Sequence, residues 1–128
     1  MTFGYTILYV PDVRAAVSFY EAAFGLAPRF VHESGDYGEL ETGATTLAFS
    51  SFRLLRGLGK APTAANPDAP CFEIALVTGD VPAAVERAIA AGAAPRRAPE
   101  QMPWGQTMAY VVDPNGVLVE ICTPAGES

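Results

Sequence analysis

The chain has 128 residues, of which 50% are hydrophobic and 17% are charged, so it is long enough for one compact domain over residues 1–128 with a buried core. Its formal net charge of −6 opposes binding to nucleic acid, because clustered lysine and arginine side chains bind phosphates. The first residues carry no basic leader, and no apolar run approaches the ~18 residues that cross a bilayer, so we expect a cytoplasmic protein with no membrane partner.

The first half predicts one strand, one helix and three further strands. Residues 5–10 alternate between two sets of side chains, as in a strand with two different faces. Asp12 suits the N-cap of a helix and Gly25 suits its C-terminal stop. The later strands are expected at residues 29–33, 37–42 and 45–50.

Residues 51–70 form a long connector that is rich in proline, glycine and alanine. It contains three of the eight basic residues, and its first part carries phenylalanine and leucine side chains. We expect this first part to form a short helix or turn that covers the domain edge or a partner subunit. The alternatives are a mobile linker and a loop over a binding site.

The second half of the chain repeats the first. Residues 73–85, EIALVTGDVPAAV, align without gaps on residues 5–17, YTILYVPDVRAAV, and the last segments of the two halves align so that Glu120 pairs with Ala48. The sequence therefore predicts a tandem duplication of a βαβββ unit. The copies are expected at residues 1–50 and 71–128, with the second helix between Asp80 and Gly92 and later strands near 95–98, 107–112 and 117–123.

Cysteine and histidine side chains predict no zinc site. Cys71 and Cys122 lie in or beside apolar strand-like runs, without CxxC spacing or a neighbouring histidine. We expect both to be reduced and buried. His32 is the single histidine and is expected at the surface or at a strand edge.

Two motifs accompany the duplication: DVxxAVxFYxxxFG opens the first unit and DPNGxxxEI closes the second. Together they resemble the vicinal oxygen chelate superfamily, which includes glyoxalase I, bleomycin-resistance proteins and extradiol dioxygenases. The resemblance implies an α+β fold in which each unit forms a curved, mixed-sheet half-barrel, and paired half-barrels enclose a cavity that often holds a divalent metal. It also implies a homodimer, in which the half-barrels pair within or between chains. The fold serves many reactions, so it does not fix the chemistry.

The resemblance implies metal ligands at four related strand positions, which are Tyr5, Ala48, Glu73 and Glu120 in this sequence. Metal-using relatives commonly carry histidine at the first-strand positions, here Tyr5 and Glu73, and glutamate or histidine at the last-strand positions. Only Glu120 keeps the usual residue. Two carboxylates, a phenol and a methyl group suit a transition ion poorly, so we expect no tightly bound metal cofactor. A weakly held hard cation such as Mg²⁺ stays open as an alternative.

Glu120 stands in an otherwise apolar strand, where an ionised carboxylate needs a partner. If Glu73 faces the same cavity, repulsion and desolvation raise at least one of the two pKa values. Such a pair can transfer protons without a metal, which makes Glu73 and Glu120 candidate catalytic residues. It can equally bind a cationic or hydrogen-bond-donating ligand, or form a structural remnant paired with an arginine or Tyr5.

The cavity is expected to be mostly apolar with an aromatic edge. Trp104 can stack on a planar ligand at its lip, or can cap the sheet or a dimer contact instead. The expected ligand-binding residues are Tyr5, Ile7, Tyr9, Phe49, Trp104, Met108 and Tyr110.

We predict a small-molecule-binding protein of the glyoxalase/bleomycin-resistance type without a tight catalytic metal, for example one that sequesters an antibiotic or another partly aromatic ligand. The alternative is a divalent-metal-dependent lyase or dioxygenase whose ion is anchored by Glu73 and Glu120. A catalytically silent interaction module is the third reading. The sequence leaves open whether the chain is an enzyme.

Overall fold

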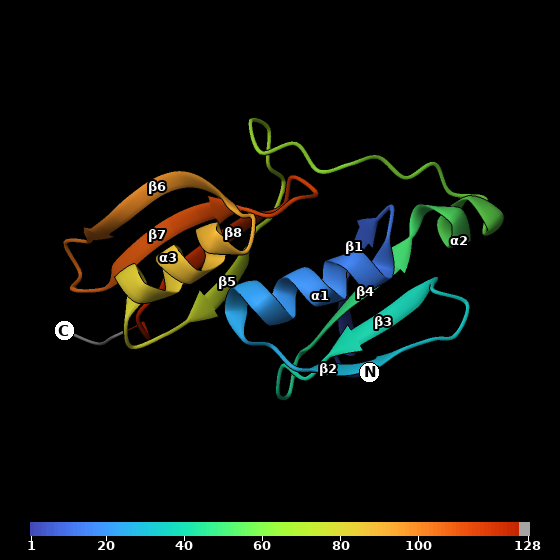
Figure 1. Ribbon diagram of the computed structural model, residues 1–128, viewed down its shortest axis with the longest axis horizontal. Helices are drawn as coiled ribbons and strands as arrows, with labels where there is room; N and C mark the ends of the chain where they lie inside the picture. Colours follow the sequence, from blue (N-terminus) through green and yellow to red (C-terminus); the bar gives the residue numbers. More distant parts are fainter. Residues whose placement is uncertain (126–128) are drawn as a thin grey trace. The chain divides into compact units, whose positions relative to one another are not determined.

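The computed structural model describes residues 1–125 and divides into two compact units, Met1–Ala64 and Ala65–Ser128 (Figure 1). The boundary falls inside the predicted connector 51–70, whose last residues belong to the second unit. None of the helices formed by residues 1–125 has the length and apolar character that crossing a bilayer requires.

The first unit is a four-stranded mixed sheet with a long helix on one face. Its elements are β1 (Tyr5–Val10), α1 (Val13–Phe24), β2 (Pro28–Val31), β3 (Tyr37–Leu40), β4 (Thr46–Ser51) and α2 (Phe52–Gly57). The strand order is β1-β4-β3-β2, with β1 parallel to β4 and the other neighbours antiparallel. The helix α2 confirms the short helix or turn expected at the start of the connector.

The second unit repeats this topology. Its elements are β5 (Ile74–Val77), α3 (Val81–Ala90), β6 (Ala94–Gln101), β7 (Thr107–Val112) and β8 (Leu118–Cys122). The strand order is β5-β8-β7-β6, with β5 parallel to β8, so the duplicated βαβββ unit is confirmed. The strand β6 is longer than predicted because it lies at the sheet edge, where two prolines and two register shifts are tolerated.

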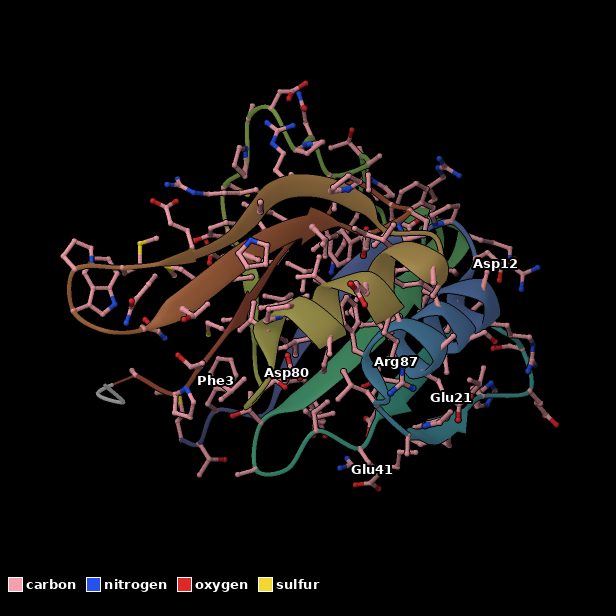
Figure 2. All side chains as sticks on the ribbon, turned by 60° about the vertical axis from the view of Figure 1, so that its left-hand side comes forward. Phe3, Asp12, Glu21, Glu41, Asp80 and Arg87 are labelled. Atoms are coloured by element: carbon pink, nitrogen blue, oxygen red, sulfur yellow. The ribbon has the colours of Figure 1, made fainter. Side chains whose placement is uncertain are left out.

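Both long helices begin at the predicted aspartates. The carboxylate of Asp12 accepts a hydrogen bond from the Ala15 backbone N–H at 3.0 Å, and Asp80 accepts one from Ala83 at 3.1 Å. Figure 2 labels both aspartates at the starts of their helices. The helix α1 ends at Gly25, whose φ of 70° is left-handed, as a glycine stop predicts.

The core of the first unit lies between α1 and one face of its sheet. Leu8, Val10 and Phe49 point to this face and are at most 2% exposed, and the Phe49 and Tyr20 rings lie 5.2 Å apart. The expectation that Phe49 lines a ligand cavity is therefore wrong, because its ring is enclosed beneath α1.

The two cysteines differ in their surroundings. Cys122 is buried as expected, and burial raises the pKa of its thiol. Cys71 is exposed, because it precedes the start of β5 instead of lying within the strand. The expectation of a buried thiol at this position is wrong.

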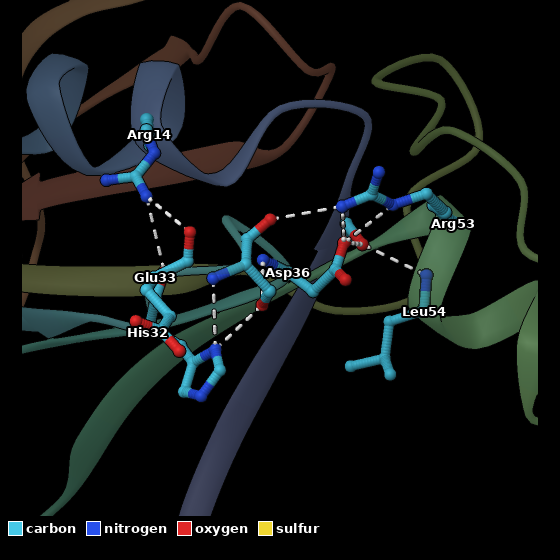
Figure 3. A network of polar contacts seen from close by, with 8 residues as sticks. Arg14, His32, Glu33, Asp36, Arg53 and Leu54 are labelled. Atoms are coloured by element: carbon cyan, nitrogen blue, oxygen red, sulfur yellow. Dashed lines mark hydrogen bonds and ion pairs between the residues drawn. The ribbon is translucent and has the colours of Figure 1, made fainter.

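Charged side chains from both helices of the first unit hold the turn between β2 and β3 (Figure 3). From α1, Arg14 donates to the backbone carbonyl of His32 at 3.3 Å. The carboxylate of Asp36 accepts from the Ser51 hydroxyl at 2.6 Å and from Arg53 of α2 at 3.1 Å. These two contacts, the first more strongly, hold the pKa of Asp36 below its ordinary value. His32 follows β2 directly, at the strand edge where it was expected.

Candidate functional site

Glu120 lies in the middle of β8, on the sheet face turned away from α3. Its neighbours Val119 and Ile121 are at most 2% exposed and belong to the core beneath α3, so alternation along the strand turns Glu120 to the opposite face, here named the open face. Residues paired across neighbouring strands project to the same side. The strand register therefore aligns one row on the open face, in the order Arg97 (β6), Tyr110 (β7), Glu120 (β8) and Ala75 (β5).

The structure brings Glu73 and Glu120 together on the open face. Glu120 is 8% exposed, and burial raises the pKa of its carboxyl. The adjacent Glu73 raises this pKa further, through a side-chain hydrogen bond and charge repulsion. Within residues 1–125, neither carboxyl forms an ion pair. In the described part of the second unit, these two acids therefore have no cationic side chain bound to them.

Tyr110 completes the polar part of this site. Its hydroxyl lies 3.5 Å from Glu73 Oε2, at the outer limit for a hydrogen bond. Burial, and after it the charges of Glu120 and Glu73, raise the pKa of Tyr110. The phenol therefore stays protonated at neutral pH and offers a hydrogen-bond donor beside the two acids.

A pocket of about 570 Å³ opens on this face, within the range that accommodates small-molecule ligands. Glu73 lines this pocket, and Glu120, which is not among the lining residues, shares a side-chain hydrogen bond with Glu73. The lining residues are Pro67, Asp68, Pro70, Glu73, Arg96, Arg97, Tyr110 and Leu118.

Sequence reasoning missed the two arginines of this pocket. Arg96 donates from Nη2 to Asp68 Oδ1 at 2.9 Å and to the Pro67 carbonyl at 3.2 Å, which ties the end of the connector to β6. Arg97 donates from Nε and Nη2 to Glu100 Oε2 at 3.1 and 2.7 Å. The available signal was an adjacent pair of arginines in a chain with only eight basic residues.

Two more predicted ligand-binding residues belong to the second unit but lie outside the pocket lining. Trp104 is 60% exposed in the turn between β6 and β7, where its Nε1 donates to Gln106 Oε1 at 2.9 Å. Met108 lies two residues before Tyr110 on β7 and pairs with Cys122, so it shares the open face.

The remaining predicted ligand-binding residues lie on the sheet of the first unit, on the face opposite α1. They keep the strand alternation that the sequence predicts, and their side chains are accessible. The exposed fractions are 56% for Tyr5, 41% for Ile7 and 40% for Tyr9.

The first unit carries a charged cluster at the corresponding place. Glu39 of β3 pairs with Ala48 of β4, as the second unit pairs its tyrosine with its buried glutamate. Glu39 is 7% exposed and accepts from Arg29 Nη1 at 3.0 Å and from the Tyr37 hydroxyl at 2.7 Å. Burial, and after it the Glu39 carboxylate, raise the pKa of Tyr37. A guanidinium thus compensates the buried acid of the first unit, which contrasts with the second.

A family model described as the Glyoxalase/Bleomycin resistance protein/Dioxygenase superfamily matches residues 2–121. The chain belongs to this superfamily. The resemblance read from the repeated motifs and the predicted α+β fold are confirmed by this match.

Solved structures resemble the chain over nearly its whole length. A glyoxalase-related enzyme from Fulvimarina pelagi is 26% identical, with a TM-score of 0.82 over 97% of this chain and 88% of that one. A family member from Burkholderia phytofirmans PsJN is 21% identical, with a TM-score of 0.80 over 96% and 98%. TioX from Micromonospora sp. ML1 is 21% identical, with a TM-score of 0.73 over 96% and 98%. No curated protein sequence matches the chain.

The residues present do not fit the tightly held divalent metal that the superfamily resemblance implies. Among residues 1–125, no three His, Cys, Asp or Glu side chains gather where they could hold an ion. Glu73 and Glu120 offer two carboxylates and no imidazole, whereas a catalytic ion usually takes three protein ligands. The corresponding strand positions of the first unit, Tyr5 and Ala48, carry a phenol and a methyl group.

Proposed function

We propose that the second unit binds a small molecule through a positively charged amine, or another hydrogen-bond-donating group, held by Glu73 and Glu120. The observation that supports this most strongly is that Glu73 lines a pocket of about 570 Å³ and is hydrogen-bonded to the buried Glu120, while neither carboxyl is ion-paired within residues 1–125. A bound ammonium group supplies the missing positive charge and favours the ionised form of Glu120.

The rest of the ligand lies against the other pocket residues. Leu118 and the two connector prolines give apolar surface, and the Tyr110 ring gives an aromatic one. Sequestration of a partly aromatic, cationic compound such as an antibiotic is the role this pocket supports best. We propose that binding needs no metal cofactor, because two carboxylates do not complete a divalent site.

Titration calorimetry with benzylamine in the presence of a chelator tests this proposal. Benzylamine carries an ammonium group, joined through one methylene to a phenyl ring, and no other polar group. We expect the wild-type protein to bind it and E120Q to bind about tenfold more weakly, because the amide no longer supplies negative charge. The matched control is E86Q, which makes the same change on an exposed position of α3 and keeps the wild-type affinity.

Two results contradict the proposal. The first is a wild-type protein that binds no benzylamine at any accessible concentration. The second is an E120Q variant with the affinity of E86Q, since that places the amine away from the acid pair.

A further inference from the structure

Side chains of opposite charge flank Tyr110 in the row on the open face. Arg97 and Glu120 both flank Tyr110, one on β6 and the other on β8. Neighbouring strands lie about 4.8 Å apart, so the backbones of these two residues are about 10 Å apart. Arg97 and Tyr110 line the pocket, and on the far side of Tyr110 the pocket is lined by Glu73, the hydrogen-bond partner of Glu120. A rigid molecule with a flat centre and oppositely charged ends fits this spacing.

Arg97 has donors to spare for a ligand. Its Nε and Nη2 bind Glu100, and its Nη1 takes part in no hydrogen bond found within residues 1–125. The Arg97 and Glu100 side chains are 57% and 52% exposed, so solvent screens their ion pair and a ligand can displace it at low cost. Arg96 also keeps Nε and Nη1 without a hydrogen bond within residues 1–125, but its Nη2 ties the connector to β6 through Asp68 and Pro67, so drawing this guanidinium to a ligand costs the connector its contact.

We propose that this pocket selects amphoteric small molecules, with the amine held by Glu73 and Glu120 and an acidic group, a carboxylate or a similar anion, held by Arg97. This inference rests on the proposed function and adds the second charged group of the ligand. A planar guanidinium pairs with a carboxylate through two parallel hydrogen bonds, which gives direction as well as attraction. The ligand ring then lies over Tyr110, between the two charged ends.

Titration calorimetry at neutral pH with two matched probes tests the inference. The probe 4-(aminomethyl)benzoate carries an amine and a carboxylate across one ring, and 4-(aminomethyl)benzamide replaces only the carboxylate by a neutral amide. We expect the wild-type protein to bind the carboxylate probe about tenfold more tightly. R97Q should bind both probes equally, with the amide affinity unchanged.

Two further variants sharpen the test. R56Q removes a guanidinium from α2, outside the pocket lining, and should keep the wild-type preference. E100Q removes the carboxylate that competes for Arg97, and should widen the preference for the carboxylate probe.

The outcomes separate this inference from the proposed function. If both probes bind with equal affinity to the wild-type protein, Arg97 recognises no acid and the inference is wrong, while amine binding stands. A preference that survives in R97Q also overturns it. If neither probe binds, the proposed function falls together with the inference.

Discussion

Glu120 and Glu39 are both buried glutamates on corresponding faces, yet their surroundings are opposite. Glu39 has the Arg29 guanidinium at 3.0 Å, whereas Glu120 has the carboxyl of Glu73 beside it. A buried acid that faces another acid destabilises the fold whenever it is ionised. We interpret this loss of stability as a sign that the site binds a cation supplied by a ligand.

The stability of E120Q tests the energetic side of this interpretation. Folding raises the pKa of the Glu120 carboxyl above its ordinary value of 4.5. Protonation of this carboxyl therefore stabilises the folded state fully at pH values below 4.5. This stabilisation is lost as the pH rises through the pKa of the folded state. We expect E120Q to raise the free energy of unfolding at neutral pH by on the order of 1 kcal/mol. Urea unfolding across pH 4 to 8 measures it.

In that experiment, the stability advantage of E120Q over E86Q should grow as the pH rises from acidic to neutral. An advantage that does not change with pH would mean that Glu120 titrates normally in the folded protein.

At the level of single residues, the alternation of side chains along residues 5–10 correctly predicted a strand with two different faces. Tyr5 and Tyr9 share the accessible face of β1, whereas Phe49 lies on the buried face of its strand. The alignment of the two halves already indicates the correct face for Phe49, because it matches Phe49 with Ile121, which is only 2% exposed. An adjacent position along a strand faces the other side of the sheet.

Among the elements, the β7–β8 hairpin and the end of the connector depend on each other. Gly116 has a φ of 85° in the hairpin turn, and a Cβ atom there would collide with the Ala65 carbonyl oxygen of the connector. The same connector continues to Pro67 and Asp68 at the pocket edge. The absence of a side chain at Gly116 thus lets the connector reach its place beside the pocket.

The variant G116A tests this dependence, with G43A as the control. Gly43 has a similar φ of 79° but open space around it, so G43A measures the backbone strain alone. We expect G43A to lower the free energy of unfolding by about 1 kcal/mol and G116A by clearly more, because it adds a backbone collision. Equal losses in thermal or urea unfolding would show that the connector is not held at this turn.

The order of the elements was predictable because the repeat supplied each assignment twice. The aspartate caps and the alternating strands recur in both copies, so one copy supports the reading of the other. The places of Arg96 and Arg97 in the pocket lining could not be predicted from the repeat. Arg96 binds Asp68, which lies 28 positions away along the chain. Asp68 belongs to the connector, which has no counterpart in the repeat. Contacts between residues far apart in the sequence depend on the tertiary fold, and local sequence patterns do not predict them.

For the whole molecule, we propose that two copies of the chain associate through sheet faces such as the one that presents Tyr5, Ile7 and Tyr9. Large apolar and aromatic side chains that stand together on an exposed sheet face commonly mark an interaction surface. A homodimer is also what the superfamily resemblance implies.

Two isoleucine variants test this assembly. Ile7 on β1 and Ile89 on α3 are 41% and 40% exposed, so I7D and I89D introduce the same charge at the same accessibility. We expect light scattering to show a dimer for the wild-type protein and for I89D, and a monomer for I7D. A wild-type monomer, or the same mass for both variants, would contradict the proposed interface.

The titration of the Glu120 carboxyl by carbon-detected NMR, with E120Q for assignment, tests the central claim most directly. In the free protein, we predict a pKa above the ordinary value of 4.5, and a fall in this pKa when benzylamine is added, because a bound ammonium stabilises the carboxylate. A pKa at or below the ordinary value, or one that benzylamine leaves unchanged, would contradict the account.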